Sequence, residues 1–233
     1  MIPVAGTLSP QSLSHGARAL FPAAVAVGVA GVGEGRAADL MTEEITALGS
    51  MAPNRAAEFI AGRLALRRAQ RSLSVPCLAV PNAADRSPQW PAGFCGSISH
   101  ACGLAIAVLA HRSDRVQSLG VDIEDDAALP ADLHDIVLVP EERAALAGKE
   151  SANRQAKIIF AAKEAVYKAQ YLLTRRLFGF EMITVSVQPQ AGCFGARFNS
   201  GIAPFRSGEH VAGRYSVCGG LIIAGLVLGA MRD

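Results

Sequence analysis

Apolar residues recur at steps of three and four along residues 152–173, which is the period of an amphipathic helix. Ile159, Ala162 and Val166 belong to the buried stripe of this predicted helix. Glu164 and Lys168 are four residues apart, so they lie one above the other on a single face. A stabilising surface ion pair explains this spacing as well as a functional site does. The helix alone therefore leaves both interpretations open.

Other segments follow the same two patterns. Further helices are predicted over residues 42–48, 54–71, 130–138 and 140–146, with Asn54 as the N-cap of the second. Short apolar runs between glycine, proline and serine predict strands over residues 23–30, 94–99, 103–109, 117–123, 182–187, 193–198, 211–217 and 221–228. The linkers 99–102 and 111–115 are short enough for antiparallel hairpins. Prolines in residues 1–22 indicate an irregular start.

The order of these elements repeats: a helix and strands are followed by a second helix and strands. We therefore expect an α+β protein with an N-terminal half over residues 1–113 and a C-terminal half over residues 114–233. The repeat is visible in element order only, and no residue-level similarity between the halves stands out.

Composition narrows the class of protein. The 233 residues carry a formal net charge of only +2, which does not by itself indicate a nucleic-acid binder. The five cysteines form no CxxC pair and suit buried free thiols in a reducing cytosol. No basic region followed by an apolar stretch marks a signal peptide. The apolar residues 217–231 fall short of the roughly 20 that span a membrane. We expect a cytoplasmic monomer that binds neither membrane nor nucleic acid.

Basic residues gather on the predicted helix 54–71. Arg63, Arg67 and Arg71 are successive fourth residues, so they form one ridge on the helix surface. A solvated helix face accounts for this ridge. The alternative is a clamp for phosphate groups or for an acidic partner, since arginine pairs well with both.

Two short motifs carry candidate chemistry. In Gly120-Val121-Asp122-Ile123-Glu124 the alternation of a strand puts both carboxylates on one face. They repel each other unless a cation lies between them, and hard oxygen ligands suit Mg²⁺ or Mn²⁺. In Gly96-Ser97-Ile98-Ser99-His100 a histidine and hydroxyl groups at a strand end are suited to a phosphate. An exposed acidic strand end and an ordinary turn histidine are the alternatives.

These two motifs, followed by Lys163-Glu164-Ala165 with Lys168, resemble in residue type and order the 4'-phosphopantetheinyl transferase superfamily. The segment Arg55-x-x-Glu58-Phe59-x-x-Gly62-Arg63 and the Trp90-Pro91 loop are similar to the enterobactin-synthase-type branch of its surfactin-type group. The resemblance implies a pseudo-dimer of two similar α/β halves with the active site at their interface. It also implies transfer of the phosphopantetheine arm of coenzyme A to a serine of an apo carrier protein, releasing adenosine 3',5'-bisphosphate.

The resemblance also implies roles for single residues. Asp122, Glu124 and Glu164 are expected to bind one Mg²⁺ ion, with Mn²⁺ as a substitute. Glu164 is further expected to accept the serine proton, directly or through a metal-bound water, and Lys168 to stabilise the leaving phosphate. The expected coenzyme A contacts are Arg55, Arg63, Arg86, Ser99, His100, Lys163 and Lys168. A role of Glu141 at the metal site stays open.

The partner expected from this branch is an acyl or peptidyl carrier protein of nonribosomal peptide, polyketide or siderophore synthesis, and a fatty-acid carrier is not excluded. Two other functions remain as alternatives. One is a module that binds the carrier or coenzyme A without catalysis, although such a module has no need of three converging carboxylates. The other is a different Mg²⁺-dependent phosphate enzyme on the same scaffold.

Overall fold

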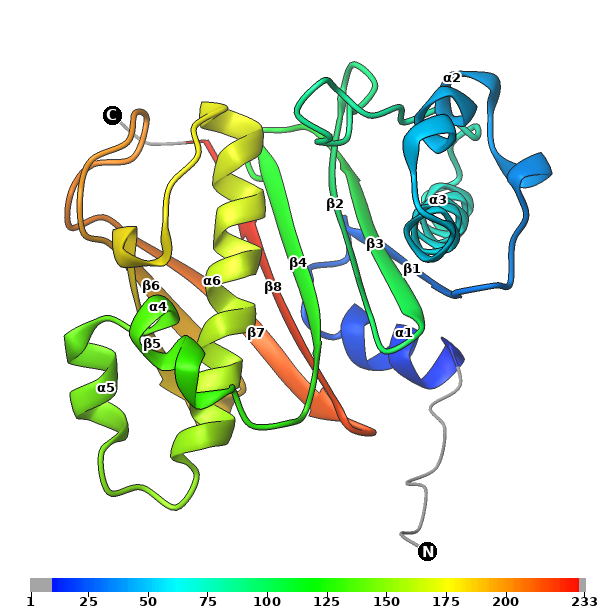
Figure 1. Ribbon diagram of the computed structural model, residues 1–233. Helices are drawn as coiled ribbons and strands as arrows, with labels where there is room; N and C mark the ends of the chain where they lie inside the picture. The colour runs from blue at the N-terminus through cyan, green and yellow to red at the C-terminus, as the bar shows by residue number, and fades with distance from the viewer. Residues whose placement is uncertain (1–9, 231–233) are drawn as a thin grey trace, which may run out of the picture.

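The computed structural model describes residues 10–230 and contains two mixed units (Figure 1). In the first unit, a three-stranded antiparallel sheet of order β1-β3-β2 is covered by helix α3, Pro53–Ser72. Its strands are β1, Ala26–Gly31, β2, Phe94–Ala101, and β3, Leu104–His111. The helices α1, Pro10–Arg18, and α2, Thr42–Ile45, also precede β2 in the chain.

The second unit has a five-stranded antiparallel sheet of order β4-β8-β7-β6-β5, covered by helix α6, Ala152–Thr174. Its strands are β4, Ser118–Asp125, β5, Ile183–Gln188, β6, Cys193–Phe198, β7, His210–Cys218, and β8, Leu221–Leu228. The short helices α4, His134–Val137, and α5, Pro140–Leu146, lie between β4 and α6 in the chain. No helix in residues 10–230 is long and apolar enough to cross a membrane.

The two units meet along strands β2 and β4, which run side by side (Figure 1). The Ser97 hydroxyl accepts a hydrogen bond from the Val121 amide at 3.1 Å, so side chains of β2 partner the free edge of β4. One apolar cluster on the face away from α3 and α6 also joins the units. It contains Leu13 of α1, Val108 of β3 and Ile123 of β4. The odd-numbered residues of β4 thus enter the core, and its even-numbered residues face α6.

The predicted strands all form within a few residues of their expected bounds, and so do the helices after residue 40. Three expectations were wrong. Residues 10–18 are helical, while residues 1–9 of the expected irregular start lie outside the described part. Helix α3 begins at Pro53 with Ala52 as its N-cap, because proline suits the first helical position. Strands β3 and β4 form no hairpin, since they belong to different sheets.

Each unit brings its long helix against a glycine of its first strand. A Cβ atom at Gly28 of β1 would lie 2.0 Å from the carbonyl oxygen of Ala65 in α3. A Cβ atom at Gly120 of β4 would lie 1.9 Å from the carbonyl oxygen of Ala165 in α6. Only glycine permits this approach, and it occurs at the same place in both units.

A buried glutamate before each long helix repeats as well. Glu44 is fully buried, and its carboxylate accepts hydrogen bonds from the amides of Met41 at 3.1 Å and Val80 at 2.9 Å. It also pairs with Arg63 of α3 at 3.7 Å. The carboxylate therefore ties the helix to two loops of the first unit.

Glu142 makes the same set of contacts in the second unit. It is 2% exposed and accepts hydrogen bonds from the amides of Val139 at 2.9 Å and Val185 at 2.6 Å. Its cation is Lys163 of α6, at 2.8 Å. The two glutamates and their cations thus occupy equivalent positions.

The long helices themselves correspond residue by residue. Residues 59–70, FIAGRLALRRAQ, align with residues 159–170, IFAAKEAVYKAQ. In both, the final glutamine donates its side-chain amide to a carbonyl just past the helix, Gln70 to Leu78 at 2.8 Å and Gln170 to Arg176 at 3.1 Å. The expectation that no residue-level similarity exists was wrong. It was missed because loops of different length shift the spacing between matching residues.

Candidate active site

Asp122 is the centre of a buried polar cluster between the two units. This residue of β4 is 3% exposed, and its Oδ1 accepts hydrogen bonds from Ser99 Oγ at 2.8 Å and Lys168 Nζ at 2.6 Å. Lys168 Nζ also lies 2.9 Å from Ser99 Oγ. Strands β2 and β4 and helix α6 therefore converge on one carboxylate. The structure brings together these three residues, which the sequence analysis had placed in separate motifs.

The cluster contains acceptor atoms with no partner among residues 10–230. Asp122 Oδ2 is buried and receives no hydrogen bond. Glu164 is half-buried, one turn before Lys168, and makes no hydrogen bond or ion pair with a described side chain. Burial raises the pKa of Glu164, and the charges of Asp122 and Glu124 raise it further. Buried acceptors without a donor from the protein are unusual, and a water molecule, a cation or a proton can satisfy them.

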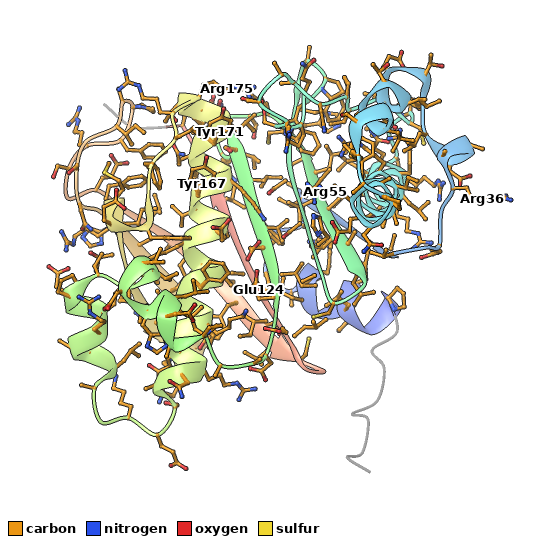
Figure 2. The ribbon with its side chains drawn as sticks, in the orientation of Figure 1. Arg36, Arg55, Glu124, Tyr167, Tyr171 and Arg175 are labelled. Carbon is orange, nitrogen blue, oxygen red and sulfur yellow. The ribbon has the colours of Figure 1, made fainter. Side chains whose placement is uncertain are left out.

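Glu124 is the next residue of β4 on the same face. Its Oε2 lies 2.8 Å from Lys157 Nζ, and the same ammonium lies 2.9 Å from Asp125 Oδ1. Burial raises the pKa of Glu124, the hydrogen bond from Lys157 opposes this, and the charge of Asp122 adds to it. Figure 2 shows Glu124 at β4, beside helix α6. Two lysines of α6 thus hold the two strand carboxylates.

As arranged here, no group of three His, Cys, Asp or Glu side chains within the described residues is positioned to coordinate a metal ion. The donor set nevertheless suits one chemically, because three carboxylates with an orphaned oxygen match the preference of Mg²⁺ for hard oxygen ligands. The lysine contacts of Asp122 and Glu124 would have to be shared or released.

The first unit has the same scaffold without these carboxylates. Counting from the paired glycines of β1 and β4, Asp122 corresponds to Ala30. In the aligned helices, Glu164 corresponds to Leu64 and Lys157 to Ala57. The residues that support the fold recur in both units, whereas these acidic and basic groups do not. The fold therefore does not require them.

His100 lies at the end of β2, opposite Arg55 and Glu58 of α3. Arg55 donates a hydrogen bond to His100 Nε2, and His100 Nδ1 lies 3.6 Å from Glu58 Oε2. Burial lowers the pKa of His100, and the charge of Glu58 opposes this while that of Arg55 adds to it. An acceptor Nε2 implies that the proton lies on Nδ1. Arg55 and His100 therefore form a half-exposed basic pair near the cluster.

A cavity of about 520 Å³ lies next to the polar cluster, and Lys168 is one of the residues that line it. Its lining includes Arg86, Trp90, Ser97, Tyr167, Tyr171 and Arg175. Arg86 has a left-handed backbone with φ of 67° at the tip of a turn. The cavity thus runs between the loop before β2 and the exposed side of α6, and Figure 2 shows Tyr167, Tyr171 and Arg175 along that side.

Two contacts from α6 hold the loop that carries Arg86. The Tyr171 hydroxyl donates a hydrogen bond to Asp85, and Arg175 Nη1 donates one to Ser87 at 3.1 Å. Sequence reasoning missed Tyr171 and Arg175. For Tyr171 the available signal was its spacing, since it continues the helix face of Glu164 and Lys168. Arg175 is the left-handed C-cap of α6, so helix spacing gives no signal for it.

The structure does not bring Lys163 to this cluster. Lys163 is 1% exposed, and besides Glu142 its ammonium donates hydrogen bonds to the carbonyls of Val137 at 2.8 Å and Phe180 at 3.0 Å. Burial lowers its pKa. All three donors are used, so the expected phosphate contact of Lys163 was wrong. The neighbouring Glu164 points elsewhere because adjacent helical residues differ by about 100°.

Two of the three arginines in the predicted basic ridge, Arg63 and Arg67, lie neither on a solvated helix face nor in an anion clamp. Arg63 is 4% exposed and donates to Asn82 Oδ1 at 2.8 Å, and Arg67 is 6% exposed and pairs with Glu44 at 2.6 Å. Burial lowers the pKa of Arg63 to about 10. Both side chains support the fold, so neither is the expected anion contact. Glu141 lies outside the cluster, with Arg197 at 3.7 Å.

Two family models match separate segments of the chain. Residues 43–110 match the family model of the 4'-phosphopantetheinyl transferase N-terminal domain. Residues 118–217 match that of the 4'-phosphopantetheinyl transferase superfamily.

Curated relatives extend the match. The chain is 34% identical over 195 residues to the 4'-phosphopantetheinyl transferase PptT of Mycobacterium tuberculosis, covering 81% of this chain and 86% of the relative. It is 37% identical over 135 residues to the 4'-phosphopantetheinyl transferase Npt of Nocardia iowensis, covering 58% of this chain and 60% of that protein. Enterobactin synthase component D of Salmonella typhi is 38% identical over 126 residues, covering 52% of this chain and 51% of the relative. The chain therefore belongs to the 4'-phosphopantetheinyl transferase superfamily, as an enzyme of the branch that includes enterobactin synthase component D.

Proposed function

We propose that this enzyme transfers the 4'-phosphopantetheine arm of coenzyme A to a serine of an apo carrier protein, with Mg²⁺, and releases adenosine 3',5'-bisphosphate. We further propose that residues 1–113 and 114–233 form a pseudo-dimer with the active site between them. The matched helices and glycine contacts support the pseudo-dimer. The two family models, which match separate segments of the chain, support it as well.

One observation carries the proposal. The acidic residues Asp122 and Glu164 lie beside Lys168 in the second unit, where the same scaffold in the first unit has apolar residues. Burying like charges costs free energy, and the corresponding positions of the first unit fold without such charges. A functional role accounts for their presence.

Mg²⁺ fits this donor set. Asp122, with its orphaned Oδ2, would hold the ion together with Glu124 and Glu164. A bound Mg²⁺ ion would neutralise negative charge on the pyrophosphate of coenzyme A. This charge builds as the serine hydroxyl attacks the β-phosphorus.

The remaining chemistry belongs to side chains of the chain. Lys168 donates hydrogen bonds into the cluster, and we assign it to an oxygen of the leaving phosphate, where positive charge stabilises the transition state. Glu164 is the proposed acceptor of the serine proton. Its carboxylate makes no hydrogen bond or ion pair with a described side chain, which leaves it available to accept a proton.

Coenzyme A is proposed to lie along the cavity beside Lys168. Arg86 on the cavity wall and the pair Arg55 and His100 supply positive or hydrogen-bonding groups for its phosphates. Ser99 holds Asp122 and Lys168 in place and is therefore proposed as a positioning residue beside those phosphates. Arg63 and Lys163 are left out of this assignment because both side chains are buried and paired with a glutamate within the fold.

The proposed partner is an acyl or peptidyl carrier protein of nonribosomal peptide, polyketide or siderophore synthesis. The enterobactin synthase name of one group of relatives favours a siderophore or peptide carrier. We propose that the enzyme works as a monomer. The five cysteines are free thiols, which supports a reducing compartment such as the cytoplasm.

The test is a labelling assay. Purified enzyme, coenzyme A and Mg²⁺ are incubated with apo peptidyl and apo acyl carriers, and the carriers are weighed by mass spectrometry. The proposal predicts a gain of one phosphopantetheine group that is lost when Mg²⁺ is chelated. Binding of coenzyme A without any gain favours a binding module instead. A different phosphorylated product favours another phosphate enzyme.

A further inference from the structure

Lys157 is a buried cation that the proposed reaction does not use. It is 8% exposed, and its ammonium lies between Glu124 at 2.8 Å and Asp125 at 2.9 Å. The ammonium also lies 5.6 Å from the centre of the Phe160 ring. A buried side chain whose ammonium group has three neighbours of this kind has little freedom to turn away.

Lys157 belongs with the acidic cluster and not with the repeated scaffold. The aligned residue of the first unit is Ala57, in a helix whose other key positions recur. That unit also lacks the carboxylates, so the lysine and the carboxylates occur together in one unit only. The second cation beside the cluster, Lys168, differs because its counterpart Arg68 is also basic.

The two lysines bracket the carboxylates. Lys168 holds Asp122 and Lys157 holds Glu124, while Glu164 lies between the lysines along α6. Without a metal ion these ammonium groups are the cations that limit the repulsion within the cluster. A metal ion that binds Glu124 must compete with Lys157 for its oxygen.

Asp125 gives Lys157 a second acceptor. Its side chain is 51% exposed, and its Oδ1 is a partner of the Lys157 ammonium separate from Glu124. A metal ion can therefore take Glu124 without leaving the buried ammonium unpaired, which would otherwise be costly.

We propose that Lys157 is a built-in counter-ion of the metal site. It holds Glu124 in the metal-free enzyme, keeps its contact with Asp125 when a divalent ion binds, and so weakens the affinity of the site for that ion. This inference rests on the proposed metal site at Asp122, Glu124 and Glu164.

The test measures metal binding without turnover. Mn²⁺ binding is followed by electron paramagnetic resonance at saturating coenzyme A, with no carrier protein present. The Glu164→Gln variant serves as the blank that removes Mn²⁺ bound by coenzyme A alone. Lys157→Met keeps an apolar stem over Phe160 and removes the charge. We expect it to bind Mn²⁺ about 10-fold more tightly, because a positive charge a few ångströms from a divalent ion opposes binding.

Three controls sharpen the result. Lys157→Arg keeps the charge and should retain an affinity close to that of the wild type. Arg154→Gln removes an exposed cation that pairs with Asp126 near the N-terminal end of the same helix, and should change the affinity by less than about twofold because the exposed charge is screened. Asp125→Asn alone should weaken Mn²⁺ binding. Its effect should be smaller when it is combined with Lys157→Met.

The outcomes separate the two proposals. Equal affinity of the wild type and Lys157→Met, both above the Glu164→Gln blank, overturns the role of Lys157 and leaves the metal site standing. If neither the wild type nor Lys157→Met binds Mn²⁺ more tightly than the Glu164→Gln blank, the metal site is overturned, and this inference with it. If Lys157→Met unfolds, thermal melting of Lys157→Gln decides: the inference predicts a larger Mg²⁺-induced rise in melting temperature than in the wild type, and an equal or smaller rise contradicts it.

Discussion

Lys163 and Glu142 form an ion pair in which both side chains are 1% exposed and the ammonium lies 2.8 Å from the carboxylate. The pair repeats the contact of Arg63 with Glu44 in the first unit. Lys163 thus acts in the scaffold, although it directly precedes a proposed catalytic residue.

Removal of one partner of this pair should destabilise the fold. Lys163→Met leaves Glu142 buried without its cation, which typically costs about 3–5 kcal/mol of unfolding free energy. Urea denaturation measures the loss. Lys149→Met, which removes an exposed lysine before the same helix, should change the unfolding free energy by less than about 0.5 kcal/mol. A Lys163→Met variant as stable as the wild type would contradict the structural role.

Lys168→Gln should lower the rate of the chemical step, while its side-chain amide still offers a hydrogen-bond donor to the buried Asp122 carboxylate. The variant loses the ammonium that contacts Asp122 and Ser99, and removal of such a stabilising donor typically costs about 100-fold or more in kcat. Steady-state labelling of an apo carrier gives kcat, and a thermal melt checks folding. A fall in kcat that follows the loss of folded protein would argue for a structural role instead.

Tyr171→Phe should weaken coenzyme A binding. The tyrosine hydroxyl holds Asp85, and with it the loop that presents Arg86 to the cavity. We expect the KM for coenzyme A to rise several-fold with kcat nearly unchanged, because the loop acts in binding. Arg176→Gln changes an exposed residue beyond the contact and is the matched control. A loss confined to kcat would overturn this assignment.

His100 should titrate below the usual histidine range. Burial lowers its pKa, so the folded state binds a proton less readily than the unfolded chain. Stability contributed by neutral His100 is present above the unfolded-state pKa of about 6.5 and is lost as pH falls through the folded-state value.

Imidazole NMR measures this titration directly. Arg55→Gln should raise the pKa of His100, because the charge of Arg55 lowers it. Arg36→Gln changes an exposed residue that Figure 2 shows apart from Arg55, and it should leave the pKa of His100 unchanged. A pKa of His100 above 6.5 in the wild type would be inconsistent with the burial seen here.

The sequence predicted the strands and long helices well because their patterns are local. It also placed Asp122 and Glu124 on one face, since alternation in a strand needs no tertiary information. Helix spacing similarly put Glu164 and Lys168 together. The meeting of these residues with Ser99 came from motif order and resemblance, because no local rule brings β2 beside β4.

The errors have a common cause. Arg63, Arg67 and Lys163 are charged, and charge was taken as a sign of exposure or ligand binding. Their burial depends on Glu44 and Glu142, which come from distant loops and are themselves buried. The pairing of Arg63 with Glu44 repeats as that of Lys163 with Glu142, so a comparison of the two helices at matching residues would have pointed to it.

The central claim is that the carboxylates of the second unit serve the reaction, whereas the corresponding residues of the first unit do not take part in it. It is tested most directly by the rate of carrier labelling for Glu164→Gln beside Leu64→Gln, its counterpart in the first unit, with folding checked for both. We predict that Glu164→Gln folds and labels at least about 100-fold more slowly, as expected for loss of a general base, while Leu64→Gln labels close to the wild-type rate. Labelling by Glu164→Gln at the wild-type rate would contradict the account.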